Sequence, residues 1–575
     1  MTTSNNEKFC LGIDAGGTHT DAALLLDGED GRSLIAYAKV KTCHEDLPSS
    51  VSAVLTALDD ATGADSTALF ARVGSITIGT TLAVNALVQG KEDAVGLALS
   101  AGPGLNPLRF GIGEHVCVVP GGLDHRGVEV SPLETREMVA AVLDWKKKSM
   151  SACACVGKFS PRNPAHERVM AAEAADFRVT QGHQLSGRLN FPRRIATAYY
   201  NAAVERLHSI FLDAVEKSLS NVGIRAPTFL LKADGGATSL SLSRRCPVQS
   251  ILSGPAASVM GILVLCPSVD QGCSLLLDMG GTTTDMALVM DGSPVIDWDG
   301  MLLNGRRTLV RSLATVSVGV GGDSLLTADS AGVHAGPLRE GPAMAFGGRR
   351  LTLMDALNVL NVACDGPVAG DMPASTRGMA ALAACCGRSL EDLAAATVED
   401  GLGRIQKAAT ALVDRVNARP IYTLAALKAA RQAMPERIVL VGGPAACVRE
   451  RLEKRFGLPV ETPVYADVAN AVGAGLTLPT ASLEIYANTG QGVLRAPALD
   501  LEERIGRSYT MEAAALRARE LLAAHLAEEA MPNAVVEVLE ADLFATISDS
   551  SYGAKDIRVA CQVAPGIAGR LRPCR

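Results

Sequence analysis

Two stretches of the chain, LGIDAGGTHTDAALLLDG (residues 11–28) and LLLDMGGTTTDMALVMDG (residues 275–292), decide the fold. Each has an apolar run, a turn of the form Asp-x-Gly-Gly-Thr-x-Thr, and a second apolar run that ends at Asp-Gly. This pattern predicts two antiparallel strands joined by a glycine-rich polar turn. The second copy lies 264 residues after the first, measured from Asp14 to Asp278. The repeat predicts two similar domains that face each other.

Both turns carry residue types that bind phosphate. Glycines permit positive φ angles and let backbone N–H groups approach an anion closely, and threonine hydroxyls add further donors. A carboxylate at the end of a strand suits a hydrated Mg²⁺ that bridges phosphates. One glycine-rich hairpin is often only structural. Two in register, each with Asp, Gly-Gly and Thr, predict a phosphate clamp.

Further along the chain, another glycine turn follows a buried strand. The run RIVLV (residues 437–441) predicts the strand, and Gly442-Gly443-Pro444 leads into a helix over residues 445–456. The segment VANAVGAGL (residues 468–476) then predicts a helix of small residues suited to close packing. Beyond about residue 480, a helix over 511–529 and strands over 534–539 and 556–563 predict a small appended unit.

These turns resemble those of the actin/Hsp70/sugar-kinase ATPase superfamily. Its two phosphate motifs look like Asp14–Asp21 and Asp278–Asp285, and its adenosine motif looks like Val439–Pro444. The resemblance implies an α/β chain with two ribonuclease-H-like (actin-like ATPase) domains around a nucleotide cleft, plus a small C-terminal α+β unit. It also implies ATP and Mg²⁺ as cofactors.

The same resemblance assigns roles to residues of the turns. Asp14 and Asp278 would hold Mg²⁺ through water, and Asp285 would orient water or metal; these three are the expected catalytic residues. The residues expected to bind the nucleotide are Gly16, Gly17, Thr18, Thr20, Gly280, Gly281, Thr282, Thr283, Gly321, Gly322, Gly442, Gly443 and Pro444.

Other segments are similar to signatures of the hydantoinase A/5-oxoprolinase family. They are IGTTLAVNAL (78–87), VGKFSPRNPAHE (156–167), SGPAA (253–257), VGVGGDS (318–324) and LTLMDAL (351–357). The resemblance covers about residues 9 to 480. It implies an N-terminal hydantoinase/oxoprolinase ATPase domain over 1–195, a hydantoinase A-type ATPase domain over 196–480, and the small α+β domain over 481–575.

Members of this family couple ATP hydrolysis to the opening of a cyclic amide such as a hydantoin or 5-oxoproline. The resemblance implies that the γ-phosphate phosphorylates the ring carbonyl oxygen and that water then attacks the activated carbon. We expect Thr80, Thr81 and Asn85 to face the cleft and contact this substrate, although the threonines could simply cap the helix that follows. The family often works with a separate B-type subunit, so a hydantoinase B-type partner is expected.

Three loops depart from the family pattern, and none of these departures changes a residue of the phosphate motifs. An aspartate, Asp323, stands where the family has glycine, and the segments 100–106 and 339–347 differ from the usual sequences. These loops leave room for two other functions. One is an ATP-driven switch that activates a partner enzyme, and the other is a small-molecule kinase of the same fold.

Two histidines allow both a functional and a structural interpretation. His166 and Glu167 could form a catalytic pair, but Asn163-Pro164 before them is a helix-entry signal that favours a structural role. His19 lies inside the first phosphate turn and could reach a phosphate or point to solvent.

Composition excludes several classes of protein. The 575 residues have a net charge of -7 and only 4% aromatic residues, which gives no support for nucleic-acid binding. No apolar run approaches the length of a membrane span, and the first residues lack a signal-peptide layout, so we expect a cytoplasmic protein without membrane contact. The 14 cysteines include no CxxC pair and are expected to be reduced, small core residues.

Overall fold

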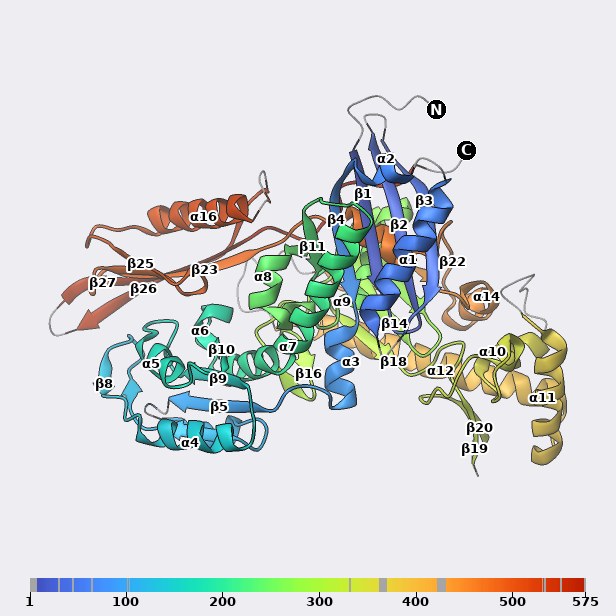
Figure 1. The fold of residues 1–575 in the computed structure, drawn as a ribbon, viewed down its shortest axis with the longest axis horizontal. Coiled ribbons are helices and arrows are strands. Elements are labelled where there is room, and N and C mark those ends of the chain that lie inside the picture. The colour runs from blue at the N-terminus through green and yellow to red at the C-terminus, as the bar shows by residue number, and fades with distance from the viewer. Residues whose placement is uncertain are drawn as a thin grey trace.

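The computed structural model describes residues 8–28, 31–43, 46–63, 66–100, 102, 104–329, 332–360, 370–420, 431–529, 531, 534–548 and 551–572. Within these ranges, four sheets of four or more strands and the helices between them form an α/β structure (Figure 1). The predicted α/β class is therefore confirmed.

The first sheet has the strand order β12-β11-β4-β1-β2-β3. Its strands are β1 (Lys8–Ala15), β2 (His19–Gly28), β3 (Gly31–Lys41), β4 (Val73–Thr80), β11 (Thr228–Leu231) and β12 (Ala237–Ser239). Helices α1 (Leu47–Thr62) and α7 (Phe191–Asn221) cover one face of this sheet, where they share a core with Phe9, Leu11 and Ile13. Because side chains alternate along a strand, the even-numbered residues of β1 point to the opposite face.

The second sheet has the order β15-β14-β13-β21-β22, and β18 pairs with β14. Its strands are β13 (Cys273–Met279), β14 (Thr284–Met290), β15 (Ser293–Pro294), β18 (Thr315–Val318), β21 (Arg437–Val441) and β22 (Val460–Glu461). Asp14 pairs with Asp21 across β1 and β2, as Asp278 pairs with Asp285 across β13 and β14. The predicted repeat of strand, turn and strand is confirmed by this shared register.

One face of the second sheet is covered by helices whose buried side chains share a core with β13 and β21. These helices are α10 (Leu353–Val359), α11 (Met372–Cys386), α12 (Leu390–Asn417) and α14 (Ala445–Phe456). The other face packs against α9 (Ser253–Leu265).

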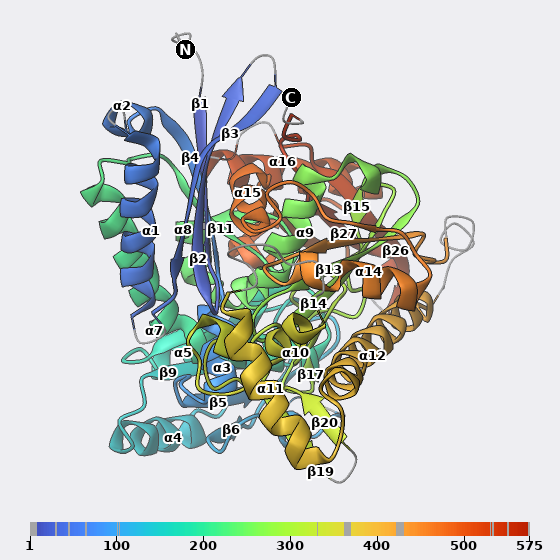
Figure 2. The ribbon, with the colours of Figure 1, turned by 90° about the vertical axis from the view of Figure 1, so that its right-hand side faces the viewer.

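Helix α9 and helix α15 (Ala469–Leu476) lie between the two sheets (Figure 2). Glycines bring their backbones into direct contact. A Cβ atom at Gly473 would lie 2.2 Å from the backbone nitrogen of Gly261, and one at Gly12 of β1 would lie 1.9 Å from the carbonyl oxygen of Ala471. The small-residue helix expected at 468–476 is thus packed as its composition predicts.

A third sheet, which the sequence did not predict as a separate unit, is inserted between β4 and α7. It is parallel, with the order β10-β9-β5-β6. Its elements are β5 (Val95–Ser100), β6 (Val116–Val119), β9 (Ala152–Gly157), β10 (Arg178–Gln181), α4 (Arg136–Lys147), α5 (Ala165–Glu173) and α6 (Gly182–Leu185), and α3 (Leu82–Gln89) leads into it. Strands buried on both faces lack the alternation that reveals a strand in sequence.

The C-terminal unit is an antiparallel sheet with the order β25-β24-β23-β27-β26, which has one face covered by α16 (Figure 1). Its elements are β23 (Ser482–Asn488), β24 (Val493–Ala496), β25 (Leu501–Arg504), α16 (Met511–Glu528), β26 (Glu537–Ser548) and β27 (Ser551–Gln562). The predicted small α+β unit is present, and the sequence missed its strands β23 to β25.

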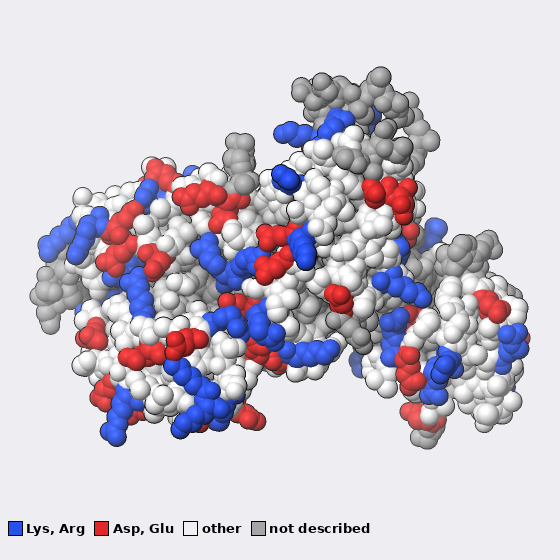
Figure 3. Space-filling model, in the orientation of Figure 1, with Lys and Arg blue, Asp and Glu red and all other residues white. Residues whose placement is uncertain are grey.

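Short elements complete the described chain. They are α2 (Ser66–Phe70), β7 (Gly122–Leu123), β8 (Glu129–Ser131), α8 (Leu240–Arg245), β16 (Leu302–Leu303), β17 (Arg306–Arg307), β19 (Leu326–Asp329) and β20 (Gly332–Ala335). Among the described helices, none combines the length and the apolar character needed to cross a bilayer. On the face shown in Figure 3, Lys and Arg side chains are interspersed with Asp and Glu side chains.

The expectation that cysteines are reduced core residues holds only in part. Several, such as Cys153 and Cys155 of β9, are free and buried. Cys43, Cys385 and Cys386 are free but exposed, and Cys447 is disulfide-bonded, so the expectation is wrong for these four. Sequence spacing reports neither exposure nor which distant cysteines the fold brings together.

Candidate functional site

The two glycine-rich turns share the same internal hydrogen bond. In the first turn the backbone N–H of Gly16 donates to the carbonyl oxygen of His19 at 3.1 Å. At the equivalent place in the second turn, the N–H of Gly280 donates to the carbonyl oxygen of Thr283 at 2.9 Å. Sequence similarity between the copies therefore extends to their backbone geometry.

These turns lie next to each other, each at the end of its own sheet. A Cβ atom at Gly281 of the second turn would lie 3.5 Å from the hydroxyl oxygen of Thr18 in the first turn. Cβ positions at Gly17 and Gly443 have no neighbouring atom within 4 Å, so the backbone there borders open space. Thr20 differs from this group, because its side chain is fully buried and bonds the Thr42 hydroxyl at 3.0 Å.

The loop with Gly321 and Gly322 packs directly on the second turn. The N–H of Gly322 donates to the carbonyl oxygen of Gly280 at 3.0 Å, and a Cβ atom at Gly321 would lie 2.6 Å from that same oxygen. Pro444 of the third glycine turn follows next, since its Cγ lies 2.7 Å from the Cβ position of Gly322. Gly442, at φ +100°, leaves no room for a side chain beside Met279 and Asp278.

The structure thus gathers the predicted nucleotide residues of four separate segments around one place. The segments are 14–20, 278–285, 321–322 and 442–444. Thr282 and Thr283 belong to the second turn, at the start of β14. The roles of these residues in nucleotide binding stay predictions. Those roles require that the four segments lie close together, and the structure shows that they do.

Two polar side chains that sequence analysis missed form hydrogen bonds to the aspartates, and one of them connects the pair. The side-chain amide of Asn470 in α15 donates to Oδ2 of Asp14 at 3.2 Å and to Oδ2 of Asp278 at 3.5 Å. Ser258 of α9 donates to the same oxygen of Asp278. A signal for Asn470 existed, because it is the one polar residue in the small-residue segment 468–476.

Burial and the charges of neighbouring carboxylates disfavour ionisation of Asp14, Asp21 and Asp285. Burial, with the charges of Asp21 and Asp278 nearby, raises the pKa of Asp14 to about 7. Burial and the charge of Asp278 likewise raise the pKa of Asp285 to about 7. The pKa of Asp21 rises to about 6, mainly because the group is buried, although Lys39 lies 3.0 Å from one of its oxygens.

This donor set fits a divalent cation. Oδ1 of Asp14 and Oδ1 of Asp21 are buried and accept no hydrogen bond from the part of the chain that the structure describes. Within that same part, no three His, Cys, Asp or Glu side chains lie close enough to hold a metal ion together. Asp14 and Asp278 stay the predicted Mg²⁺ residues, and the prediction has them act through water, which needs no cluster of three side-chain ligands.

The segment with Thr80, Thr81 and Asn85 adjoins the first phosphate turn. The N–H of Thr81 donates to the carbonyl oxygen of Ala15 at 3.2 Å, and the amide of Asn85 donates to the Thr81 hydroxyl at 3.2 Å. Thr80 is buried, and its hydroxyl accepts the N–H of Leu82 at 3.1 Å, which is a capping role. Thr81 and Asn85 are half-buried, so they remain the candidates for substrate contact.

The unusual Asp323 lies beside the second turn and has a cationic partner. Its N–H donates to the carbonyl oxygen of Gly281 at 2.7 Å, and Arg339 lies 2.9 Å from its carboxylate. Arg339 belongs to the segment 339–347, another of the loops that depart from the family pattern. The Arg339 guanidinium offsets the negative charge of Asp323 at the place where phosphate is expected.

Burial and the charge of Lys39 lower the pKa of His19, whose role stays open.

The 156–167 motif lies in the inserted sheet and does not join the phosphate turns. Glu167 is fully buried and accepts the backbone N–H of Gly157 at 2.8 Å and Nδ1 of His183 at 2.6 Å. His166 is buried between Ser100, at 2.9 Å, and Glu129, at 3.0 Å. These contacts favour the structural interpretation of both residues.

Two similar domains whose glycine-rich turns face each other are the defining feature of the actin-like ATPase fold. The structure matches nucleotide-free acetone carboxylase with a TM-score of 0.74 at 16% identity, covering 99% of this chain and 89% of that one. It matches the ATP-dependent caprolactamase from Pseudomonas jessenii with a TM-score of 0.72 at 20% identity, covering 98% and 89%. The chain has this fold.

The chain belongs to the hydantoinase/oxoprolinase family. The Hydantoinase/oxoprolinase model matches residues 194–482, and the model of the family's N-terminal region matches residues 10–176. The chain is 26% identical to the caprolactamase alpha subunit of Pseudomonas jessenii over 492 residues, which are 79% of this chain and 68% of that protein. It is also 26% identical to the acetophenone carboxylase gamma subunit of Aromatoleum aromaticum over 408 residues, which are 62% of this chain and 54% of that protein.

Proposed function

We propose that this chain is the nucleotide-binding subunit of an enzyme that opens a cyclic amide at the expense of ATP. The observation that carries the proposal is the meeting of the two phosphate turns, with Asn470 between Asp14 and Asp278. Family membership and the similarity to the alpha subunit of a caprolactamase support a lactam or a related ring as the substrate.

In the proposed reaction, the backbone N–H groups of the two turns and the hydroxyl of Thr18 bind the phosphates and orient the terminal one. Bound Mg²⁺, held through water by Asp14 and Asp278, would supply charge neutralisation. Thr81 and Asn85 would position the ring so that its carbonyl oxygen meets the terminal phosphate. Phosphorylation of that oxygen turns a poor electrophile into one that water can attack, and alignment contributes much of the rate.

The test is ATP turnover, with Mg²⁺ present, by the natively expressed chain purified together with any subunit that accompanies it, across a panel of hydantoins, 5-oxoproline and lactams. Stimulation by one ring, together with detection of the ring-opened product, is the expected result. Stimulation only by an added protein would instead indicate the ATP-driven switch. A stable phosphorylated product would indicate a kinase. Both of these outcomes would overturn the proposal.

ATP-dependent carboxylation is a second candidate, because acetone carboxylase shares the fold and the gamma subunit of acetophenone carboxylase is a relative. Carboxylation consumes bicarbonate and ring opening does not. ATP turnover that requires bicarbonate and a ketone would therefore favour this alternative.

We also propose that the chain works with a partner subunit of the hydantoinase B type. Two of its relatives bear the names of subunits, alpha of caprolactamase and gamma of acetophenone carboxylase. Co-purification of the natively expressed chain, followed by mass spectrometry, tests this; a chain that purifies alone and opens the ring alone would refute it.

A further inference from the structure

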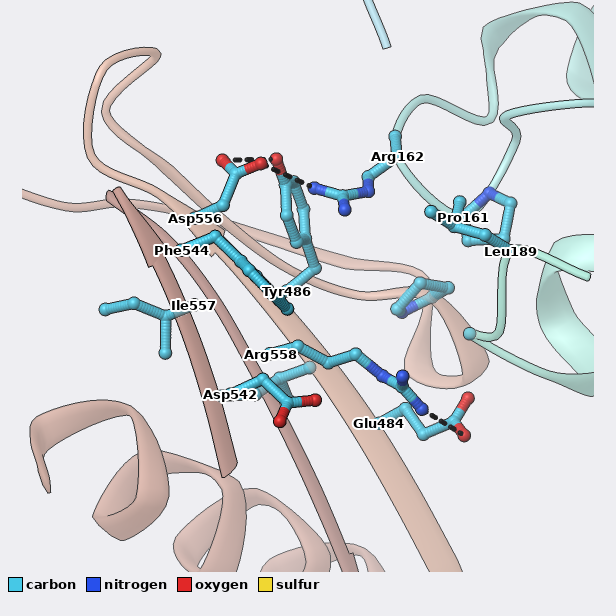
Figure 4. A pocket seen from close by; sticks show the side chains of 13 residues that line it. Pro161, Arg162, Leu189, Glu484, Tyr486, Asp542, Phe544, Asp556, Ile557 and Arg558 are labelled. Carbon is cyan, nitrogen blue, oxygen red and sulfur yellow. Dashed lines mark hydrogen bonds and ion pairs between the residues drawn. The ribbon is translucent and has the colours of Figure 1, made fainter. Parts of the chain in front are cut away.

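A cavity of about 180 Å³ lies between the inserted unit and the C-terminal sheet. Pro161, Arg162 and Leu189 line it from the inserted unit, and Tyr486, Asp542 and Phe544 line it from the sheet (Figure 4). Strands β23, β26 and β27 are remote from the phosphate turns in Figure 1, so this cavity is separate from the nucleotide site. Engineered cavities of about 150 Å³ accept a benzene ring, so this one has room for a small organic molecule.

Strand alternation explains why the sheet's side of the cavity is polar. Odd-numbered residues such as Ile485 and Ile557 pack against α16 in the core of the unit. Even-numbered residues point to the other face, toward the inserted unit. They include the carboxylates Glu484, Glu540, Asp542 and Asp556, together with Arg558.

Three arginines at this junction are already paired with carboxylates. Arg188 lies 2.7 Å from Glu484, and Arg558 lies 3.2 Å from Glu540. Arg162 lies 3.5 Å from Asp556.

The third pair is held firmly in place. The Arg162 guanidinium lies over the Tyr486 ring at 3.3 Å from its centroid. The Tyr486 hydroxyl donates to Asp556 at 2.8 Å. These groups form one side of the cavity in Figure 4.

Asp542 is the one carboxylate of these four that is not paired with an arginine of the described chain. It makes no hydrogen bond and no ion pair with any residue of the chain that the structure describes, and it is half-buried in the cavity wall. Phe544, two residues further along β26, points to the same side and is 60% exposed. A free carboxylate beside an exposed aromatic ring is the combination that attracts an organic cation.

We propose that this cavity binds a small organic ammonium compound with an apolar body. Its ammonium group donates hydrogen bonds to Asp542, and its apolar part lies against Phe544, Pro161 and Leu189. The charge balance of the lining supports a cation, because three carboxylates, of Glu484, Asp542 and Asp556, face the two guanidinium groups of Arg162 and Arg558, and one added positive charge neutralises the cavity. The ligand touches both units and therefore stabilises their contact.

The test uses cyclohexylamine as the probe, with cyclohexanol and cyclohexanecarboxylate as matched compounds without the cation. Isothermal titration calorimetry on the full, nucleotide-free chain is expected to show saturable binding of the amine alone. Asp542→Asn keeps the shape of the side chain and is expected to weaken binding by roughly tenfold or more, since it removes a charge-assisted hydrogen bond.

Glu540→Gln is the matched control, because it removes a carboxylate of the same strand face that does not line the cavity. It is expected to leave the affinity for cyclohexylamine unchanged, and both variants are compared with the wild type by thermal melting. Absence of saturable amine binding, equal binding of the carboxylate, or unchanged affinity in Asp542→Asn would each overturn the proposal. None of these readouts depends on ATP turnover, so the result stands apart from the proposed reaction.

Discussion

Replacement of Asn470 by alanine tests the geometry of the phosphate turns most directly. The change removes the amide that donates to Asp14 at 3.2 Å and to Asp278 at 3.5 Å, and these aspartates belong to different sheets. A hydrogen bond to a charged group contributes about 1.5–3 kcal/mol. Both distances are long for N–H···O bonds, so we take about 1.5 kcal/mol for the pair, which predicts a loss of roughly tenfold in kcat for ATP hydrolysis.

The assay is steady-state phosphate release with Mg²⁺ and saturating ATP. Asn417→Ala is the matched control, because Asn417 also makes two hydrogen bonds, both to Ala433, at a site apart from the turns. The control is expected to lower the melting temperature and to leave turnover per folded molecule unchanged. Turnover of Asn470→Ala within about twofold of the wild type would refute the role that we assign to this amide.

Three other changes probe a predicted catalytic aspartate, the contact between α9 and α15, and a buried titratable group. Asp14→Asn is expected to abolish ATP hydrolysis while leaving the protein folded, and full activity would contradict the assignment of the site. Gly473→Ala puts a Cβ atom 2.2 Å from the nitrogen of Gly261 and is expected to lower the melting temperature clearly; an unchanged melting curve would show that the helices can separate at no cost. Burial and the charge of Arg244 lower the pKa of His208 to about 4, below the ordinary 6.5, so the unfolded chain binds its proton more readily. Stability is therefore expected to fall, by up to about 3 kcal/mol, as pH drops from 6.5 to 4, and His208→Gln should remove that part of the dependence in urea melts at several pH values.

The sequence predicts the two phosphate turns because their chemistry is local. Aspartate, paired glycines and threonines between apolar runs need no distant partner to be recognised, and the resemblance built on them predicts the two-domain fold. Asn470 could not be assigned in this way, because its role depends on α15 lying between two sheets. The small residues of this short segment predict that the helix packs closely. They do not predict which side chains its one polar residue contacts.

The inserted sheet was missed for a different reason. Its strand β9 reads ACACVG and is buried on both faces, so it lacks the alternation of apolar and polar residues that marks a half-exposed strand in a sequence. The 156–167 motif was attributed to the family, but its contacts within the inserted unit became visible only in three dimensions. Nothing in the sequence indicates that Asp542 lacks a partner. Whether a carboxylate is paired depends on which arginines the neighbouring strands place beside it, and this is visible only in the fold.

The glycine contact between α9 and α15 also sets where the two halves of the molecule can pivot. Backbones in direct contact at Gly261 and Gly473 cannot move closer, so a relative rotation of the halves has its fulcrum there. Asn470 lies one helical turn from Gly473 on the same helix, close to that fulcrum. A rotation about this contact therefore displaces the nearby aspartates little. It displaces the inserted unit and the C-terminal sheet most, because displacement grows with distance from the axis of rotation.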